Sequence, residues 1–261
     1  AGGGASVRIS RGRVMSGDEM TALITGASGG IGHALCAEFR RAGYRVMATD
    51  VVGATRLSCD HFVEADLKAI CREETRLKRF VQQLGLPASG LTVLVNNAAV
   101  QILNRTETVS RQDWRDTLDV NVLAPFLLTQ ALLQYLERAG GSVVNIGSVH
   151  ATATKPGFVC YATSKAALVG LTRALAVDLG GRVRVNAINP AAVATPMLLE
   201  GFKGKDPQFA ALGGMHPVGR IAEPAEIAQA ALFLASPHAA FVTGAAFDVD
   251  GGILSRLHDP D

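Results

Sequence analysis

Short apolar segments and amphipathic segments alternate along this chain, from about residue 20 almost to its end. The apolar segments resemble strands that are covered on both faces, and the amphipathic ones carry apolar residues at helical spacing. This alternation predicts an α/β fold, a single doubly wound parallel sheet with helices on both faces. The predicted strands are residues 21–25, 44–50, 61–66, 91–98, 141–148, 182–190 and 245–252. The predicted helices are residues 30–43, 67–84, 114–138, 161–179 and 223–235.

The pattern also predicts how the chain is divided. No linker or internal repeat interrupts it, so residues 20–261 are expected to form a single domain. Residues 1–19 are rich in glycine and basic residues and lack an apolar core, which indicates a disordered or artificially added tail, or partly a leader. Residues 191–222 show no strong pattern, and a segment of that length is usually a lid, a binding loop or disordered.

The composition limits what the chain binds. Of the 261 residues, 48% are hydrophobic, enough for a large core. The formal net charge is +2, and no basic cluster suggests a nucleic-acid partner. No apolar run approaches the roughly 18 residues of a membrane span. The four cysteines lack metal-binding spacing and read as free thiols of a reducing compartment. We therefore expect a cytoplasmic protein with no metal, membrane or nucleic-acid partner.

A glycine-rich turn, TGASGGIG at residues 25–32, joins the first predicted strand to the first predicted helix. Gly26, Gly30 and Gly32 lack a Cβ atom, so the backbone can approach a pyrophosphate and the helix can pack close to the strand. The phosphates would lie at the positive N-terminal end of that helix, beside Ser28 and Ile31. A glycine motif alone is weak. A strand, a turn and a helix in this order predict a dinucleotide site in a Rossmann-type domain.

Asp50 supports the same site, because it ends the second predicted strand about 20 residues after the glycine turn. A carboxylate there can accept hydrogen bonds from the ribose hydroxyls of an adenosine, and it would repel a 2′-phosphate. The residues that follow, Val51, Val52 and Gly53, are not basic, and neither is Gly29. The sequence thus predicts NAD as the cofactor in preference to NADP.

Further motifs resemble those of the short-chain dehydrogenase/reductase family, in order, over nearly the whole chain. The glycine turn is similar to that family's TGxxxGxG motif, and NNA at residues 96–98 is similar to its NNAG motif. Asn121 falls in the long predicted helix in which the family has a catalytic asparagine. Ser148 ends the fifth predicted strand, and YATSK at residues 161–165 matches YxxxK at the family's usual distance from the serine.

Two positions depart from the family's pattern. Ala99 replaces the glycine of NNAG, and Ala191 replaces the glycine of a Pro-Gly pair after the sixth strand. Each change adds a methyl group, which could shift the nicotinamide pocket but removes no catalytic group.

The resemblance implies an oxidoreductase that interconverts a secondary alcohol and a ketone. An alcohol must lose its hydroxyl proton, and Tyr161 is the expected base. Free tyrosine has a pKa near 10, and Lys165, one helical turn away, is placed to lower it. The family's pattern further implies that Ser148 holds the substrate oxygen, that Lys165 also holds the nicotinamide ribose, and that Asn121 supports a water chain from Lys165.

The resemblance also implies further coenzyme contacts. Asp66 and Leu67 match positions that flank the adenine, and Asn97 and Ala98 match positions beside the ribose. Tyr161 and Lys165 contact the coenzyme as well as the substrate. The segment that would hold the carboxamide supplies Pro190, Val193 and Thr195.

The substrate stays open at this point. Gln101, Ser148, His150 and Ala192 are the predicted contacts, and the polar side chains of Gln101 and His150 would favour a polyol or a sugar. Met197, Leu198, Leu199 and Phe202 could equally line an apolar pocket for a ring or an acyl chain. Phe158 and His216 are further candidates.

Three other functions are alternatives to this oxidoreductase. The chain could be a non-catalytic dinucleotide-binding regulatory protein, but no catalytic motif residue is missing. It could be an NADP-dependent 3-oxoacyl-type reductase. A sugar-nucleotide epimerase would need a larger C-terminal domain than the chain after Pro190 allows. Relatives are often homotetramers that pair their long helices, here residues 114–138 and 161–179, so a homo-oligomer, a tetramer or a dimer, is expected.

Overall fold

A computed structural model describes residues 19–52 and 57–257 of the chain. Residues 1–18 of the predicted tail and Gly53, used above to predict the coenzyme, lie outside the described residues.

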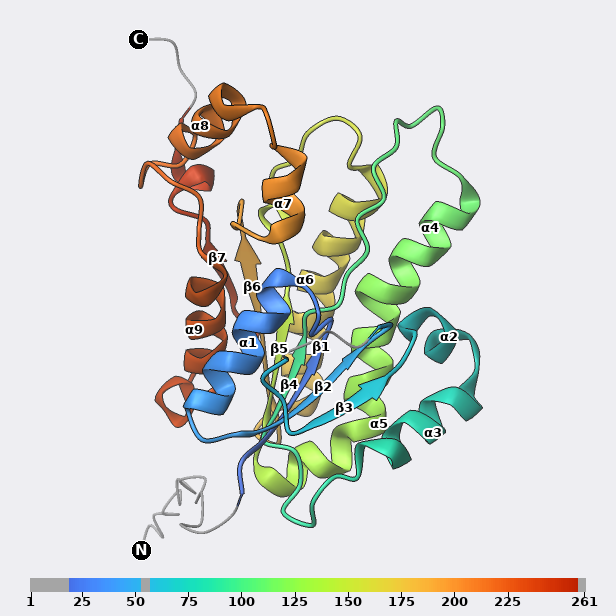
Figure 1. The fold of residues 1–261 in the computed structure, drawn as a ribbon. Coiled ribbons are helices and arrows are strands. Elements are labelled where there is room, and N and C mark those ends of the chain that lie inside the picture. Colours follow the sequence, from blue (N-terminus) through green and yellow to red (C-terminus); the bar gives the residue numbers. More distant parts are fainter. Residues whose placement is uncertain (1–18, 53–56, 258–261) are drawn as a thin grey trace, which may run out of the picture.

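All seven predicted strands form, and they join in one parallel sheet. The strands are β1 Thr21–Thr25, β2 Arg45–Asp50, β3 His61–Glu64, β4 Val93–Asn96, β5 Ser142–Ile146, β6 Arg184–Pro190 and β7 Ala246–Val249. Their order is β3-β2-β1-β4-β5-β6-β7 (Figure 1). The winding direction reverses between β1 and β4, and at such a point the carboxyl ends of the strands leave a crevice for a ligand. The predicted fold class is confirmed.

Helices cover both faces of the sheet (Figure 1). The α-helices of the described residues are α1 Gly30–Arg41, α2 Leu67–Arg72, α3 Glu74–Leu84, α4 Arg111–Leu118, α5 Ala124–Ala139, α6 Val159–Leu179, α7 Pro196–Gly201, α8 Asp206–Gly214 and α9 Pro224–Ala235. Helices α1 and α9 share one buried cluster with alternate strand residues such as Ala22 and Ile24. Helices α3, α5 and α6 share the other cluster with the intervening Leu23. The period of two along a strand thus divides the core between the two faces.

Two predicted helices are wrong in their continuity. The segment predicted as one helix over residues 67–84 divides into α2 and α3, because Glu73 between them is extended. No glycine or proline lies in this stretch, so nothing in the sequence marks the break. The helix predicted over residues 114–138 contains a π-helical turn at Asp119–Leu123, between α4 and α5.

Residues 191–222, whose sequence shows no strong helix or strand pattern, contain α7 and α8. The two ends of this segment meet where Val193 bridges to Ala222. Thr195 caps α7 and Pro196 begins it, a helix-start signal that the prediction overlooked. Both helices stand above the carboxyl ends of the strands (Figure 1).

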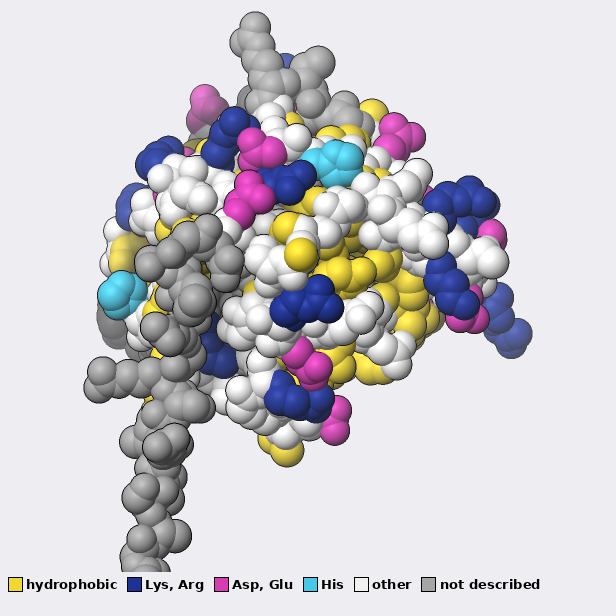
Figure 2. Space-filling model, turned by 90° about the horizontal axis from the view of Figure 1, so that it is seen from below, with side chains coloured by type: hydrophobic (Ala, Val, Ile, Leu, Met, Phe, Trp, Pro, Cys, Tyr) yellow, Lys and Arg dark blue, Asp and Glu magenta, His cyan; other side chains and the backbone are white. Residues whose placement is uncertain are grey.

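The opposite end of the molecule is seen in Figure 2, where hydrophobic side chains gather over one part of the face and basic and acidic side chains lie scattered around it. Among the described residues, no helix is both long and apolar enough to cross a membrane.

Candidate active site

The glycine turn lies at the carboxyl end of β1, beside the reversal point of the sheet. Gly26 has a positive φ of 62°, and a Cβ atom there would lie 2.7 Å from Cα of Ala98. A Cβ on Gly32 would lie 2.1 Å from the carbonyl oxygen of Gly26. Both glycines are therefore required by close packing. A Cβ on Gly30 would lie 2.9 Å from Cβ of Thr195, so α7 begins directly above the turn.

Helix α1 begins at Gly30, and no side chain caps its first turn. Its free amide groups and its dipole can receive an anion, as a pyrophosphate requires. Ile31 packs its side chain against the core cluster of α1 and α9, so its backbone is the part that can serve a ligand. The turn therefore fits the phosphates of a dinucleotide.

Asp50 is directed back toward the glycine turn. The Ser28 amide donates to Oδ2 of Asp50 across 2.9 Å, and the Val51 amide donates to Oδ1 across 2.7 Å. The hydroxyl of Ser28 donates to the carbonyl of Val52. Because a carboxylate has about four lone-pair sites, Asp50 retains acceptor capacity for two ribose hydroxyls.

Asn97 and Ala98 fasten the end of β4 to the glycine turn. The Asn97 amide side chain donates to the carbonyls of Thr25 and Gly26, at 3.0 and 2.9 Å. The backbone amides of Asn97 and Ala98 both donate to the Thr25 hydroxyl. Both residues thus lie against the glycine turn.

Asp66 and Leu67 lie after β3, at the same edge of the sheet. Asp66 caps α2 by accepting from the Lys68 amide at 2.9 Å. The side chain of Leu67 is buried in the core, so only its backbone remains for an adenine.

The structure brings Ser148, Tyr161 and Lys165 together. Lys165 is only 2% exposed, its Nζ donates to the carbonyl of Ile146 across 2.7 Å, and it lies 5.6 Å from the centre of the Tyr161 ring. Burial lowers the pKa of Lys165 to about 8. Burial also raises the pKa of Tyr161, and the adjoining Ser148 side chain opposes that rise. In the protein without coenzyme, the group that lowers the pKa of Tyr161 is thus Ser148, whereas the sequence led us to expect Lys165.

Asn121 lies in the π-helical turn and is 1% exposed. Its side chain donates to the Val100 carbonyl and the Ser164 hydroxyl, each at 2.9 Å, and accepts from the Val100 amide. Pro125 explains the turn: it has no N–H for the Asn121 carbonyl four residues earlier, and its ring would crowd that oxygen. The side-chain amide protons of Asn121 are therefore committed to Val100 and Ser164.

An aromatic layer covers Tyr161. The rings of His150 and Phe158 stack at 4.3 Å, and both meet the Tyr161 ring edge-on, at 5.8 and 6.1 Å. Nδ1 of His150 is bonded to the Thr154 hydroxyl at 2.9 Å. Burial, with a smaller effect of Lys155, lowers the pKa of His150. His150 thus lies beside Tyr161.

The remaining predicted residues are more dispersed. Gln101 is exposed in the loop after β4. Pro190 ends β6, Val193 is buried in its bridge to Ala222, and Thr195 caps α7 over the glycine turn.

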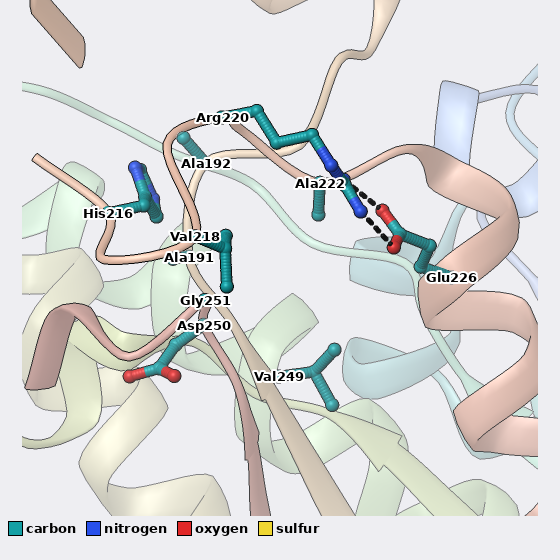
Figure 3. A pocket seen from close by; sticks show the side chains of 10 residues that line it. All are labelled: Ala191, Ala192, His216, Val218, Arg220, Ala222, Glu226, Val249, Asp250 and Gly251. Carbon is teal, nitrogen blue, oxygen red and sulfur yellow. Dashed lines mark hydrogen bonds and ion pairs between the residues drawn. The ribbon is translucent and has the colours of Figure 1, made fainter. Parts of the chain in front are cut away.

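Ala192 lines a separate small cavity of about 120 Å³, beneath the segment over residues 191–222 (Figure 3). Along it Arg220 forms a bidentate ion pair with Glu226, at 2.7 and 2.8 Å, which lowers the pKa of Glu226 to about 2. The sequence analysis missed this pair, although Glu226 also closes a capping box with Glu223 at the start of α9. His216, also on the cavity wall, is 3% exposed.

Over the described residues, no group of three or more His, Cys, Asp or Glu side chains could hold a metal ion. The four cysteines are free thiols.

Comparison with known proteins extends the likeness to whole chains. Residues 26–254 match the profile of a family described as enoyl-(acyl carrier protein) reductase. The chain is 36% identical over 243 residues to D-threitol dehydrogenase of Mycolicibacterium smegmatis, covering 90% of this chain and 93% of that one. It is 32% identical to acetoacetyl-CoA reductase of an Acinetobacter species, over 90% and 98% of the two chains. The solved structure of Thermoplasma acidophilum aldohexose dehydrogenase superposes with a TM-score of 0.85 at 30% identity, over 93% of this chain and 97% of that one.

Proposed function

The chain belongs to the short-chain dehydrogenase/reductase family, and on that premise we propose that it is an NAD(H)-dependent oxidoreductase that interconverts a secondary alcohol and a ketone. The observation that carries the proposal is the grouping of Ser148, Tyr161 and Lys165 at the carboxyl edge of the sheet, the edge that also carries the glycine turn.

Each chain group has a separable task in this reaction. Ser148 hydrogen-bonds the substrate oxygen and fixes the carbinol carbon. The phenol oxygen of Tyr161 takes the hydroxyl proton during oxidation and returns it during reduction. A dinucleotide held by its phosphates at the glycine turn would supply the hydride chemistry through its nicotinamide, while the chain's own residues hold the substrate and move the proton. Lys165 supplies positive charge next to the phenol ring. In this proposal the backbone carbonyl of Asn121 holds the water chain through which the proton is exchanged with solvent.

Burial alone opposes this use of Tyr161, because it raises the pKa of the phenol. A phenol held neutral by its surroundings keeps its proton until a partner charge offsets the loss. A positive charge next to the ring, on Lys165 and on an oxidised nicotinamide, is such a partner. We infer that the assembled site, rather than the protein alone, makes Tyr161 a base.

Asp50 supports NAD over NADP. Its carboxylate is held at the end of β2 by the amides of Ser28 and Val51, so it cannot turn away from the adenosine ribose. An anion fixed there would repel a 2′-phosphate. An NADP-dependent 3-oxoacyl-type reductase is the second candidate, and the acetoacetyl-CoA reductase among the relatives favours its acyl substrate.

The names of the relatives indicate different classes of substrate. D-threitol dehydrogenase points to a polyol, and acetoacetyl-CoA reductase points to an acyl thioester. We place the substrate against His150 and Ser148, beside Tyr161, with Gln101 and Ala192 as outer contacts.

The test is turnover of a panel of polyols, hydroxy acids and ketones with NAD(H) and NADP(H), followed by nicotinamide absorbance. Turnover with NAD(H) that depends on Tyr161 is expected. Tight NAD binding with no turnover of any compound would support the non-catalytic alternative.

We also propose a homo-oligomer. Leu118, Leu123 and Val159 are each more than a third exposed, and Val177 on α6 is 84% exposed. These side chains lie on the helices that relatives pair. Light scattering on the purified protein, with Val177→Glu and the remote Val52→Glu compared, tests it: a smaller mass for the first variant alone is the expected outcome.

A further inference from the structure

Lys155, Phe158 and Tyr161 form a column in which the ammonium lies over the Phe158 ring and the Phe158 and Tyr161 rings meet edge-on. Nζ of Lys155 lies 4.9 Å from the centre of the Phe158 ring, whose own centre is 6.1 Å from that of Tyr161. The ammonium therefore lies no farther from the centre of the Tyr161 ring than the sum of these two distances. Phe158 is buried, while Lys155 is exposed, so the column runs from the interior of the site to its mouth.

No ion pair engages Lys155 within the part of the chain that the structure describes, nor does one engage Arg105. Arg105 follows Asn104, whose amide donates to the Gly157 carbonyl beside Phe158. Two basic residues, Lys155 and Arg105, thus lie on adjoining loops close to Phe158. The neighbouring acid Asp113 accepts from the Ser110 amide and the Asn104 side chain, so its Oδ2 is directed at those donors.

The positive charge of Lys155 acts on His150 inside the site, because it contributes to the lowered pKa of that imidazole. An ammonium that rests on an aromatic face also loses little mobility when it pairs with an anion. Both features suit an anionic group at the outer end of a substrate whose carbinol lies at Tyr161.

We propose that Lys155 selects substrates that carry an anionic group, a carboxylate or a phosphate, at the end remote from the reacting alcohol. The inference rests on the proposed function and narrows its substrate class, against neutral polyols. Lys155 is a specificity residue in this proposal, and Arg105 widens the same positive mouth.

The test compares matched pairs of alcohols on the NAD-loaded enzyme. 3-Hydroxybutyrate is paired with butane-1,3-diol, 5-hydroxyhexanoate with hexane-1,5-diol, and glycerol 3-phosphate with glycerol. Values of kcat/KM, and dissociation constants from calorimetry with NADH, are measured for each pair. The anionic member of at least one pair should be preferred by about threefold or more, the range of an exposed charge pair. The carboxylate and phosphate pairs show which anion is taken.

Lys155→Gln should abolish that preference by weakening only the anionic member, while Lys155→Arg retains it. Lys78→Gln, an exposed lysine on α3, is the control and should change neither member. About 1 M salt, where the Debye length falls to about 3 Å, should also erase the preference.

Equal or better binding of the neutral member in all three pairs overturns the inference, as does equal loss on both members in Lys155→Gln. Tyr161-dependent turnover of neutral alcohols alone would leave the proposed function standing while removing Lys155 from it. If no compound turns over, the calorimetric preference still decides the inference.

Discussion

Nζ of Lys165 donates a hydrogen bond to the carbonyl oxygen of Ile146 across 2.7 Å, so the ammonium of this α6 residue is held at the end of strand β5. This bond places the charge below the Tyr161 ring and leaves the ammonium buried beside backbone. The site thus uses a strand end, rather than an acidic partner, to position its cation.

Lys165 should make stability rise with pH. Its pKa is lowered to about 8 in the folded chain by burial, against about 10.4 when unfolded. Below about pH 8 both states hold the proton and the burial penalty is complete. Between the two values the unfolded chain binds more protons, so the free energy of unfolding increases, by as much as about 3 kcal/mol.

Urea unfolding of the wild type and of Lys165→Met across this pH window checks the prediction. The difference between the two curves isolates Lys165 from other groups that titrate there, and it should shrink as the pH rises. Lys155→Met, which removes an exposed lysine, serves as the control and should run parallel to the wild type.

Tyr161→Phe should reduce kcat by about 10³-fold or more, because it removes the proposed proton acceptor while keeping the edge-on ring contacts with His150 and Phe158. NAD affinity should change by less than about threefold, since the glycine turn and Asp50 supply the main contacts. Stopped-flow turnover and fluorescence titration of NADH measure the two quantities. Tyr135→Phe, on α5 and away from the site, is the matched control, and full activity of Tyr161→Phe would defeat the assignment.

Asp50→Ala should lower kcat/KM for NAD by about tenfold to a hundredfold, the effect of losing hydrogen bonds to a charged group. It should also raise the use of NADP relative to NAD, since the repelling charge is gone. The ratio of kcat/KM for the two coenzymes is the measurement. Glu64→Gln is the control, because Glu64 pairs with Asp50 in register on β3 and carries the same charge. An unchanged ratio in Asp50→Ala would show that another group discriminates the coenzymes.

The alternation of apolar and amphipathic segments was enough to predict the sheet, because strands buried on both faces and helices with one apolar stripe differ in length and period. Tyr161 and Lys165, the proposed proton acceptor and its charged neighbour, were predicted from the resemblance to the YxxxK motif, and their spacing of four on one helix makes them neighbours. Their electrostatics could not be predicted, since burial depends on what the rest of the chain packs around them.

The π-helical turn shows more clearly which features could not be predicted from the sequence. Pro125 lies inside the helix predicted over residues 114–138, and its missing N–H leaves the Asn121 carbonyl without that helical partner. The break at Glu73 and the column from Lys155 to Tyr161 carry no such local signal. They arise from contacts between segments that are distant in the sequence or from the course of a loop.

Pro125→Ala should test the origin of the π-helical turn. An alanine restores an N–H that can bond to the Asn121 carbonyl, so the turn should tighten toward an α-helix and draw Asn121 away from Val100 and Ser164. We expect kcat to fall by about tenfold to a hundredfold through this misplacement, with the fold intact by circular dichroism. Leu123→Ala, in the same turn and 38% exposed, should retain activity. Wild-type kcat in Pro125→Ala would mean that the turn does not depend on the proline.

Gly32 and Gly29 offer a steric comparison within one turn. A Cβ on Gly32 would overlap the Gly26 carbonyl at 2.1 Å and Cα of Ala27 at 2.7 Å, both rigid backbone atoms. On Gly29 the nearest atom would be 3.5 Å away, an ordinary contact, and its φ of −76° suits any residue. Gly32→Ala should therefore destabilise the protein by about 1–3 kcal/mol and weaken NAD binding by about tenfold or more, because the first turn of α1 must move. Gly29→Ala should change stability by less than about 0.5 kcal/mol. Thermal unfolding and NAD titration of both variants are the measurements, and equal behaviour of the two would contradict the close packing described for this turn.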